Sequence, residues 1–318
     1  MLQIVTSWDR LRQVLLKAID RQRYHFGHVF ERVEQDGNGV YVHFANGRSE
    51  RADLLVACDG FRSSVRGQVA PDVQPVYSGY YLWRGAPNES DLSPETRRTA
   101  FPYVSFFLAD QLQSFGYPIA GADDELRPGH RRYNWGWYRV ADAAKLKEMC
   151  ADDHGREYEF GVPPPLVRKD LIVQMRAEAE TLLPPQYLDC LQHIDQPFFT
   201  PGYDFCSPNL AFGRVALVGD AASTARPHIG FGTAKAGAEA QALAQALSNY
   251  DDVDRALTAY NAVRQPLSER IVAHGRKLGM QLGVGIETDE DRRLAKLLQT
   301  PKGWLDWVAA ANFLEMRA

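Results

Sequence analysis

One segment of the chain, Gly213–Ala240, combines an apolar strand, a glycine-rich turn and an alanine-rich helix. In an open α/β sheet, ligands bind beyond the carboxyl ends of the strands, where a helix N-terminus offers free N–H donors and a positive dipole end. Glycine lets the backbone approach a flat ligand because it has no Cβ. We therefore predict a ligand site at this turn, with Asp220 accepting a hydrogen bond from a ligand hydroxyl. The alternative is an ordinary strand–loop–helix connection whose glycines serve only the loop.

A second segment has a similar pattern. The apolar strand Leu54–Ala57 leads into Asp59-Gly60, and either Ser63 or Ser64 is expected to cap the short helix that follows. A single match of this kind is weak, whereas two matches in order and far apart form a strong signal.

The two segments resemble the second and third flavin motifs of the class A FAD-dependent aromatic hydroxylases, which have the para-hydroxybenzoate hydroxylase fold. The middle motif is Asp-Gly-x-x-Ser-x-x-Arg, and the last is Gly-Asp-Ala-Ala followed by Pro and then Gly-x-Gly. The matching residues are Asp59, Gly60, Ser63, Arg66, Gly219, Asp220, Ala221, Ala222, Pro227, Gly230 and Gly232. The resemblance implies an FAD site. Its expected contacts are Asp59, Gly60, Arg66, Gly219, Asp220, Ala221, Pro227, Gly230, Gly232, Thr233 and Ala234.

Other segments resemble the branch of this family that hydroxylates 2,6-dihydroxypyridine and related N-heteroaromatic rings. They are Trp83–Gly85, Asn134–Tyr138, Arg226–His228 and Gly232–Lys235. The chain departs from the general family pattern at three positions. Many members carry His, Asn and Asp where this sequence has Ser223, Ala234 and Glu239.

The resemblance implies an α/β fold. An FAD-binding nucleotide domain with an N-terminally truncated three-layer sheet would carry an α+β substrate domain on a mainly antiparallel sheet. We expect residues 1–75 to form the first part of the FAD-binding domain, 76–201 the substrate domain, 202–286 the second part of the FAD-binding domain and 287–318 a C-terminal helical segment.

The spacing of apolar residues predicts the helices and strands in outline. An amphipathic helix capped by Thr6 or Ser7 is expected at the start, and Trp304 with Trp307 predicts an apolar contact face near the end. The expected strands are His28–Val33, Val40–Phe44, Arg51–Ala57, Tyr77–Trp83, Tyr103–Leu108, Leu112–Tyr117 and Tyr133–Val140. The other expected helices are Ala141–Cys150, Pro165–Leu183, Thr233–Asn249 and Val253–Leu278.

The opening motif of the family, Gly-x-Gly-x-x-Gly, does not occur in the 318 residues. In the family this motif lets the backbone meet the FAD pyrophosphate at a helix N-terminus. The adenine half of the FAD site is therefore expected to be missing from the sequence as given. Three explanations stay open: a start assigned too late, a partner half on a separate chain, or a truncated, inactive fragment that binds FAD poorly.

Charge and hydropathy exclude other classes of partner. A formal net charge of −4 gives no basic surface for nucleic acid, and no apolar run approaches the roughly 18 residues of a membrane span. Because the N-terminus does not look like a signal peptide, we expect a cytoplasmic protein. The four cysteines are expected to be reduced, buried thiols without a bound metal, since no Cys-x-x-Cys spacing occurs. They are Cys58, Cys150, Cys190 and Cys206.

The resemblance also implies the reaction. NAD(P)H would reduce the flavin, O₂ would supply the oxygen, and the substrate would be a small, electron-rich aromatic or N-heteroaromatic ring, with a homodimer left open. Aromatic walls from Trp83, Trp135, Trp137 and Tyr138 are expected to keep the substrate pocket dry, with Trp83, Trp135 and Tyr138 as substrate contacts. Because strand residues alternate faces, about half of such side chains would instead be core, and Trp135 would face away from Tyr138.

His228 is the expected acid–base residue and a substrate contact. It lies between the strand end and the helix N-terminus, where family members face the flavin ring, and a near-neutral pKa would suit proton exchange with a ring hydroxyl. The alternative is a loop histidine bonded to its own backbone. Arg226 is expected to pair with a substrate oxygen or with Glu239, and Arg84 to bridge the domains or to bind an anion.

Overall fold

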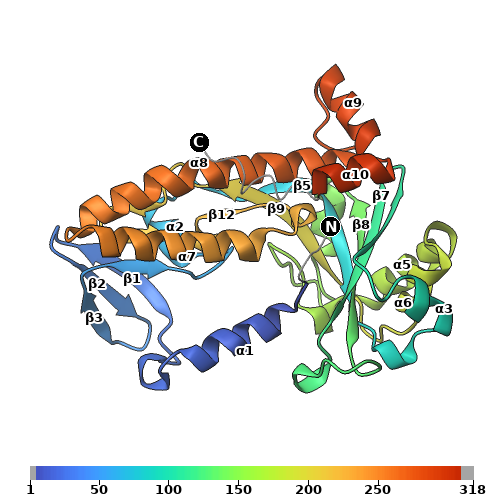
Figure 1. Cartoon of the computed structure of the whole chain (residues 1–318), viewed down its shortest axis with the longest axis horizontal. Helices are drawn as coiled ribbons and strands as arrows, with labels where there is room; N and C mark the ends of the chain where they lie inside the picture. The colour runs from blue at the N-terminus through green and yellow to red at the C-terminus, as the bar shows by residue number, and fades with distance from the viewer. Residues whose placement is uncertain (1–4, 309–318) are drawn as a thin grey trace. The chain divides into compact units, whose positions relative to one another are not determined.

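The computed structural model describes residues 5–308, which divide into two compact units (Figure 1). Unit 1 contains residues 5–23, 79–202 and 280–308, and unit 2 contains residues 24–78 and 203–279. The chain changes units after residue 23, inside strands β5 (Val76–Gly85) and β9 (Phe198–Cys206), and after helix α8 (Val253–Gly279). The four-part division expected from the sequence stays a prediction.

Unit 2 holds two small sheets. One is an antiparallel meander, and the other pairs two parallel strands with a short antiparallel third strand. The meander runs β1 (Phe30–Gln35), β2 (Val40–Phe44) and β3 (Ser49–Ala52). The other sheet has the order β10 (Ala211–Phe212), β11 (Val215–Leu217) and β4 (Leu55–Ala57).

The continuous strand predicted for Arg51–Ala57 is wrong. Strand β3 ends at Ala52 and pairs with β2, whereas β4 begins at Leu55 and pairs with β11 in the other sheet. The chain bends at Asp53 because it must change sheets there. Apolar alternation does not distinguish one long strand from two short strands in different sheets.

The helices of unit 2 are α2 (Ser64–Val69), α7 (Gly232–Asn249) and α8. Figure 1 shows α7 and α8 lying side by side, as their contacts require. Their apolar faces pack with the meander and β11 in one core. Core members include Val33, Val40, Val42, Val215, Leu217, Leu243, Leu257 and Tyr260. The buried Tyr260 hydroxyl donates to the carbonyl oxygen of Leu217 at 2.9 Å, which ties α8 to the end of β11.

Unit 1 is built on an antiparallel sheet, as expected. Its strands follow the order β9, β5, β8 (Arg132–Val140), β7 (Leu112–Ile119) and β6 (Ser105–Ala109). The short strand β12 (Ser223–Thr224) pairs with the part of β9 that belongs to unit 2. Helices α3 (Pro94–Thr99), α5 (Lys169–Leu182) and α6 (Pro185–Gln192) gather on one side of this sheet (Figure 1). Helix α4 (Ala143–Met149) follows β8 and is capped by Asp142, whose side chain accepts from the Lys145 N–H at 2.7 Å.

The helix predicted for Pro165–Leu183 begins later than expected, at Lys169. Residues Pro164–Leu166 form a separate 3₁₀ turn, because prolines there remove N–H donors that a continuous helix would need. The prediction also missed α6, which starts at Pro185 only a few residues after α5 ends. Proline at the first helical position supports a helix start, so this signal was present in the sequence.

The remaining helices also belong to unit 1. Helix α1 (Trp8–Ala18) is present where expected, and its cap is Ser7, whose hydroxyl accepts from the Arg10 N–H at 3.1 Å. Helices α9 (Asp289–Leu298) and α10 (Pro301–Val308) follow α8 and its 3₁₀ turn. Trp304 of α10 is buried against Phe106, with ring centroids 5.7 Å apart. The part of the expected C-terminal segment after residue 308 lies outside the described residues.

Two smaller features complete the fold. The four cysteines are free, but Cys58, which follows the short strand β4, is exposed and Cys206 is only half-buried, so the expectation of buried thiols is wrong for these two residues. Within residues 5–308, no helix combines the length and the apolar character that crossing a membrane requires.

The 3₁₀ turn Met280–Leu282 holds a hairpin of the unit 1 sheet. Fully buried Gln281 donates from Nε2 to the carbonyl oxygens of Ala109 and Leu112, both at 3.0 Å, at the β6–β7 turn. Replacing Gln281 with Leu leaves these carbonyls without their donor, so the free energy of unfolding should fall by about 1–3 kcal/mol. Urea unfolding followed by circular dichroism measures the change.

Gln299→Leu is the matched control. Gln299 Nε2 donates to the exposed Asp110 carboxylate of the same hairpin at 3.1 Å, and water can replace that bond. The control should therefore lose much less stability. Equal losses in the two variants would contradict a supporting role for Gln281.

Candidate functional site

The two motif turns lie at the same edge of a sheet. Because β4 and β11 are parallel, with Leu55 opposite Val215 and Ala57 opposite Leu217, their carboxyl ends point the same way. The first motif therefore begins beside the second, although more than 150 residues separate them in the sequence.

The first motif is held together by its own side chains. Asp59 accepts from the Ser63 hydroxyl at 2.6 Å and from the Val65 N–H at 3.2 Å. Ser63 in turn caps α2 by accepting from the Arg66 N–H at 2.8 Å, which settles the choice between Ser63 and Ser64. Asp59 thus serves the shape of the turn, and its contact with FAD stays a prediction. The following Gly60 has φ +80°, a conformation that favours glycine.

Arg66 joins the two motifs. Its guanidinium donates to the carbonyl oxygens of Phe61 at 2.7 Å and of Ala221 at 3.2 Å, and lies 4.1 Å from the centre of the Phe205 ring. Burial lowers the pKa of Arg66, and the negative charge of Asp59 opposes this. The arginine therefore fixes the backbone of the second motif from inside the protein, and its direct contact with FAD stays a prediction.

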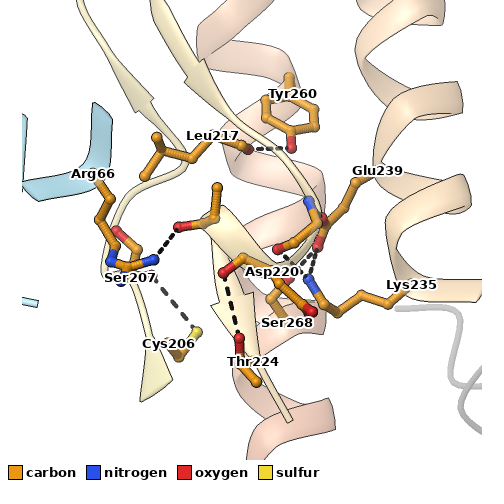
Figure 2. A network of polar contacts seen from close by, with 12 residues as sticks. Arg66, Cys206, Ser207, Leu217, Asp220, Thr224, Lys235, Glu239, Tyr260 and Ser268 are labelled. Carbon is orange, nitrogen blue, oxygen red and sulfur yellow. Dashed lines mark hydrogen bonds and ion pairs between the residues drawn. The ribbon is translucent and has the colours of Figure 1, made fainter. Parts of the chain in front are cut away.

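A buried ion pair holds the second motif from the other side (Figure 2). Lys235 and Glu239, one turn apart in α7, are both fully buried, and their side chains meet at 3.0 Å. Glu239 accepts from the Gly219 N–H at 2.7 Å, and Lys235 donates to the Gly219 carbonyl oxygen at 2.9 Å. Ser268 of α8 adds a third donor to Glu239 at 2.8 Å. Both polar groups of Gly219 are thus clamped, which holds this residue at φ +67°.

Asp220 follows this clamp and points away from it, to the surface. Although its side chain is exposed, partial desolvation raises the pKa of Asp220, and the positive charge of Lys235 opposes that rise. Its backbone carbonyl accepts from the Thr224 hydroxyl at 3.3 Å (Figure 2). The backbone of Asp220 is therefore held, and its exposed carboxylate can accept a hydrogen bond from a ligand.

The start of α7 is open on its outer side. Built Cβ atoms at Gly230 and Gly232 would meet no described atom within 4 Å, and Gly230 has φ +58°. The N-cap Phe231 makes no side-chain hydrogen bond to the first turn, where Thr233 and Ala234 are exposed. The first turn of this 18-residue helix thus has N–H groups without a side-chain cap, beside glycines that leave room for a ligand. Pro227 and the buried Ala221 belong to the same loop, and their expected contacts with FAD stay predictions.

His228 lies inside the second motif, in the loop between β11 and α7, where Pro227–Ile229 form a 3₁₀ turn. Its side chain is buried, with 5% exposed. Burial, reinforced by the charge of Arg226, lowers the pKa of His228 to about 3. The near-neutral pKa expected from the sequence is therefore not found, because a loop position gives no sign that the imidazole is desolvated.

Arg226 has a partner that the sequence did not predict, and its pairing with a substrate oxygen stays a prediction. Its Nε donates to the buried carboxylate of Asp204 at 2.7 Å, and Asp204 also accepts from Arg276 Nε at 2.8 Å. The role of Asp204 was not predicted from the sequence. Its signal was an acidic residue inside an apolar strand, which needs a charged partner when buried.

The predicted substrate residues do not share one face. Trp83 lies opposite Trp137 in the β5–β8 register, so both side chains point to the same face of the sheet. Arg139, two residues after Trp137, also points to this face, where it pairs with Glu178 of α5 at 2.8 Å. Trp135 is on this side as well, two residues along β8. Tyr138 points to the other side, as the alternation predicted. Trp83 and Trp135 thus pack in the layer beneath the helices of unit 1, and the substrate role of all three stays a prediction.

Comparisons with known proteins identify related sequences. A family model described as FAD binding domain-like matches residues 77–204. The 2,6-dihydroxypyridine 3-monooxygenase of Paenarthrobacter nicotinovorans is 28% identical over 256 residues, which cover 80% of this chain and 63% of that protein. An FAD-dependent urate hydroxylase of Klebsiella pneumoniae is 29% identical over 274 residues, which cover 85% of this chain and 63% of that protein.

A solved structure shows the same fold. The 2,6-dihydroxypyridine-3-hydroxylase of Arthrobacter nicotinovorans matches with a TM-score of 0.81 and 25% identity, over 88% of this chain and 70% of that chain. The expected α/β fold and the resemblance to class A flavin hydroxylases are confirmed. The chain spans 63% of the length of both curated relatives.

The Lys235–Glu239 pair gives the first prediction from this site. Lys235→Met leaves the Glu239 carboxylate buried without its cation, so the free energy of unfolding should fall by about 3–5 kcal/mol. Adding Glu239→Gln removes the stranded charge, so the double variant should be more stable than the single one. Urea unfolding followed by circular dichroism compares them.

Lys302→Met is the matched control, because Lys302 pairs with Asp306 at the same spacing on the surface of α10. Exposed pairs of this kind contribute little, so this variant should unfold like the wild type. A small effect of Lys235→Met, equal to that of the control, would contradict the clamp.

The depressed pKa of His228 gives the second prediction. The unfolded chain takes up a proton on this histidine near pH 6.5, whereas the folded chain does so only at about pH 3. Between these values the unfolded state binds more protons, so stability falls as the pH falls, by up to about 1.4 kcal/mol per pH unit. His228→Gln should remove this part of the slope, which urea unfolding at several pH values measures.

His25→Gln is the control, because His25 is exposed in the same unit. Its unfolding free energy should follow that of the wild type across this pH range. If the His228→Gln curve also runs parallel to the wild type, His228 protonates freely in the folded state and the burial argument is wrong.

Proposed function

We propose that this relative of the flavin hydroxylases provides the flavin-side and ring-binding parts of an FAD-dependent monooxygenase. The reaction is hydroxylation of an electron-rich aromatic or N-heteroaromatic ring with NAD(P)H and O₂. One observation carries the proposal: parallel strands bring both motifs to one sheet edge, where Arg66 joins them and Lys235 with Glu239 clamps Gly219. The names of the matched relatives, a dihydroxypyridine monooxygenase and a urate hydroxylase, support this reaction type.

The residues of the second motif fit a flavin. A flat ring system needs backbone that it can approach closely, and the clear space at Gly230 and Gly232 provides it. Asp220 would accept a hydrogen bond from a ribitol or ribose hydroxyl, and the free N–H groups at the start of α7 would face the polar edge of the ring. Bound FAD would supply the redox chemistry that passes electrons from NAD(P)H to O₂.

We propose that His228 contacts the substrate as a hydrogen-bond acceptor, which narrows the acid–base role expected from the sequence. With a pKa of about 3 it is neutral at physiological pH, so its imidazole can accept a hydrogen bond from a ring hydroxyl. Burial opposes full transfer of the proton to this nitrogen. The residue therefore orients and polarises the hydroxyl, and substrates that ionise easily suit it best.

The alternative, a truncated and catalytically inactive fragment, is not favoured. The relatives reported above are monooxygenases, and the hydrogen bonds that position the two motifs in unit 2 are in place. The proposal includes a cytoplasmic location and use of NADH or NADPH. A homodimer stays open, and size-exclusion chromatography with light scattering tests it.

Labelled oxygen tests the reaction. The chain is supplied with FAD, NADH or NADPH and 2,6-dihydroxypyridine under ¹⁸O₂, and the product is analysed by mass spectrometry. We expect one ¹⁸O atom in the ring product and NAD(P)H consumption that depends on FAD. Label drawn from water, or no ring product with 2,6-dihydroxypyridine, urate or 3-hydroxybenzoate, would contradict the proposal.

Asp220→Asn tests the cofactor site. The change keeps the size of the side chain and an acceptor oxygen but removes the charge that strengthens the hydrogen bond, so FAD should bind about 1 kcal/mol more weakly. Isothermal titration calorimetry of the chain with FAD measures this. Asp254→Asn, at an exposed position in the first turn of α8, is the control and should leave FAD binding unchanged. An unchanged Kd in Asp220→Asn would place the flavin elsewhere.

A further inference from the structure

On one face of the unit 1 sheet lies Arg84, whose cation has no carboxylate partner among residues 5–308. In the strand register Arg84 of β5 lies opposite Gly136 of β8, which in turn lies opposite Phe115 of β7. In the next row Asn134 lies opposite Tyr117. Directly paired residues share a face, and so do alternate residues of one strand. Arg84, Phe115, Tyr117 and Asn134 therefore point to the same side, together with Tyr138.

Arg84 is half-buried and makes no hydrogen bond or ion pair among the residues that the structure describes. The guanidinium carbon of Arg84 lies over the ring of Phe198, 5.7 Å from the ring centre. Arg139 of β8 points to the opposite face and pairs with Glu178 at 2.8 Å. Withdrawing a charge from water is unfavourable unless a partner compensates for it. Arg84 thus lacks the kind of partner that Arg139 has.

The surroundings of Arg84 combine aromatic rings with polar groups. The rings of Phe115 and Tyr117 are stacked with centroids 6.2 Å apart, and Phe115 lies 5.7 Å from Tyr138. Gly136 leaves room for this arrangement, since a built Cβ would lie 2.6 Å from the Phe115 ring. This part of the face offers an aromatic surface with a cation at its edge.

The charge of Arg84 acts on the hydroxyl groups beside it. Burial raises the pKa of Tyr117, while Arg84 and a side-chain hydrogen bond with Asn134 oppose that rise. Burial also raises the pKa of Tyr138, and Arg84 again opposes it. The phenol of Tyr117 stays protonated at physiological pH, so it can donate a hydrogen bond. Arg84, Tyr117 and Asn134 thus bring a guanidinium, a hydroxyl and an amide to one place.

These groups match one kind of ligand. A planar ring would pack on Phe115 and Tyr117, and a negatively charged oxygen on that ring would compensate the guanidinium. A neutral ring would leave the arginine without a partner. We propose that Arg84, Tyr117 and Asn134 form an anion subsite that anchors the substrate through a ring carboxylate or an ionised ring hydroxyl. The assignment rests on the proposed function, since it takes this ligand to be the ring that is hydroxylated.

Pairs of probes that differ only in charge test the subsite. The chain is titrated by calorimetry with 3-hydroxybenzoate and 3-hydroxybenzamide, and with 6-hydroxynicotinate and 6-hydroxynicotinamide. We expect each carboxylate to bind at least tenfold more tightly than its amide. Titration with 2,6-dihydroxypyridine at rising pH tests whether an ionised ring hydroxyl binds instead of a carboxylate. If the affinity increases as this ring ionises, the subsite binds an ionised hydroxyl.

Variants connect the preference to Arg84. Arg84→Met should abolish the preference for the anion and leave amide binding unchanged, and Arg84→Lys should restore part of it. Arg139→Met is the matched control, because it removes an arginine from the opposite face of the same sheet, and it should keep the full preference. Tyr117→Phe is a smaller change and should weaken anion binding severalfold. This variant tests the subsite if Arg84→Met does not fold.

These titrations need neither NAD(P)H nor O₂, so the two proposals fail separately. A chain that shows the Arg84-dependent preference but forms no ring product contradicts only the proposed function. A chain that hydroxylates a ring, yet binds anions and amides equally or keeps its preference in both Arg84→Met and Tyr117→Phe, overturns the subsite. Wild-type chain that binds no anionic probe overturns it as well.

Discussion

The shape of the flavin-side turn depends on one peptide group held from both ends. The Glu239 carboxylate accepts a hydrogen bond from the Gly219 N–H, and the Lys235 ammonium donates one to the Gly219 carbonyl oxygen. Each of these two charges can be buried because the other compensates for it. From this fixed point Asp220 turns outward, and the carbonyl oxygen of Ala221 meets Arg66 of the other motif. The geometry of the turn therefore depends on side chains from α7, α8 and α2 together, and so on the folding of unit 2 as a whole.

Local signals explain what could be predicted. Ser63 and Ser7 cap their helices, and β2 has the predicted ends, because capping and alternation act over a few neighbouring residues. The two motif segments were identified from glycine and aspartate at fixed spacing after apolar strands. The opposite facing of Trp135 and Tyr138 followed from strand geometry alone.

The features that could not be predicted from the sequence depend on contacts between residues far apart in the chain. Asp204, the partner of Arg226, lies in strand β9, so its role appears only after β9 and the loop that contains Arg226 and His228 are folded together. The low pKa of His228 depends on how many atoms surround the imidazole, a quantity that no local pattern contains. Alternation placed Trp83 and Trp135 relative to Tyr138 but did not say which face the helices cover.

The six tryptophans of the sequence, Trp8, Trp83, Trp135, Trp137, Trp304 and Trp307, all belong to unit 1. Residues 24–78 and 203–279, which form unit 2, contain none. Intrinsic indole emission therefore follows unit 1 alone, and the loss of the motif-bearing unit would pass unseen in it. Comparing that emission with far-ultraviolet dichroism during unfolding distinguishes one cooperative transition from two, because coincident curves require the units to unfold together.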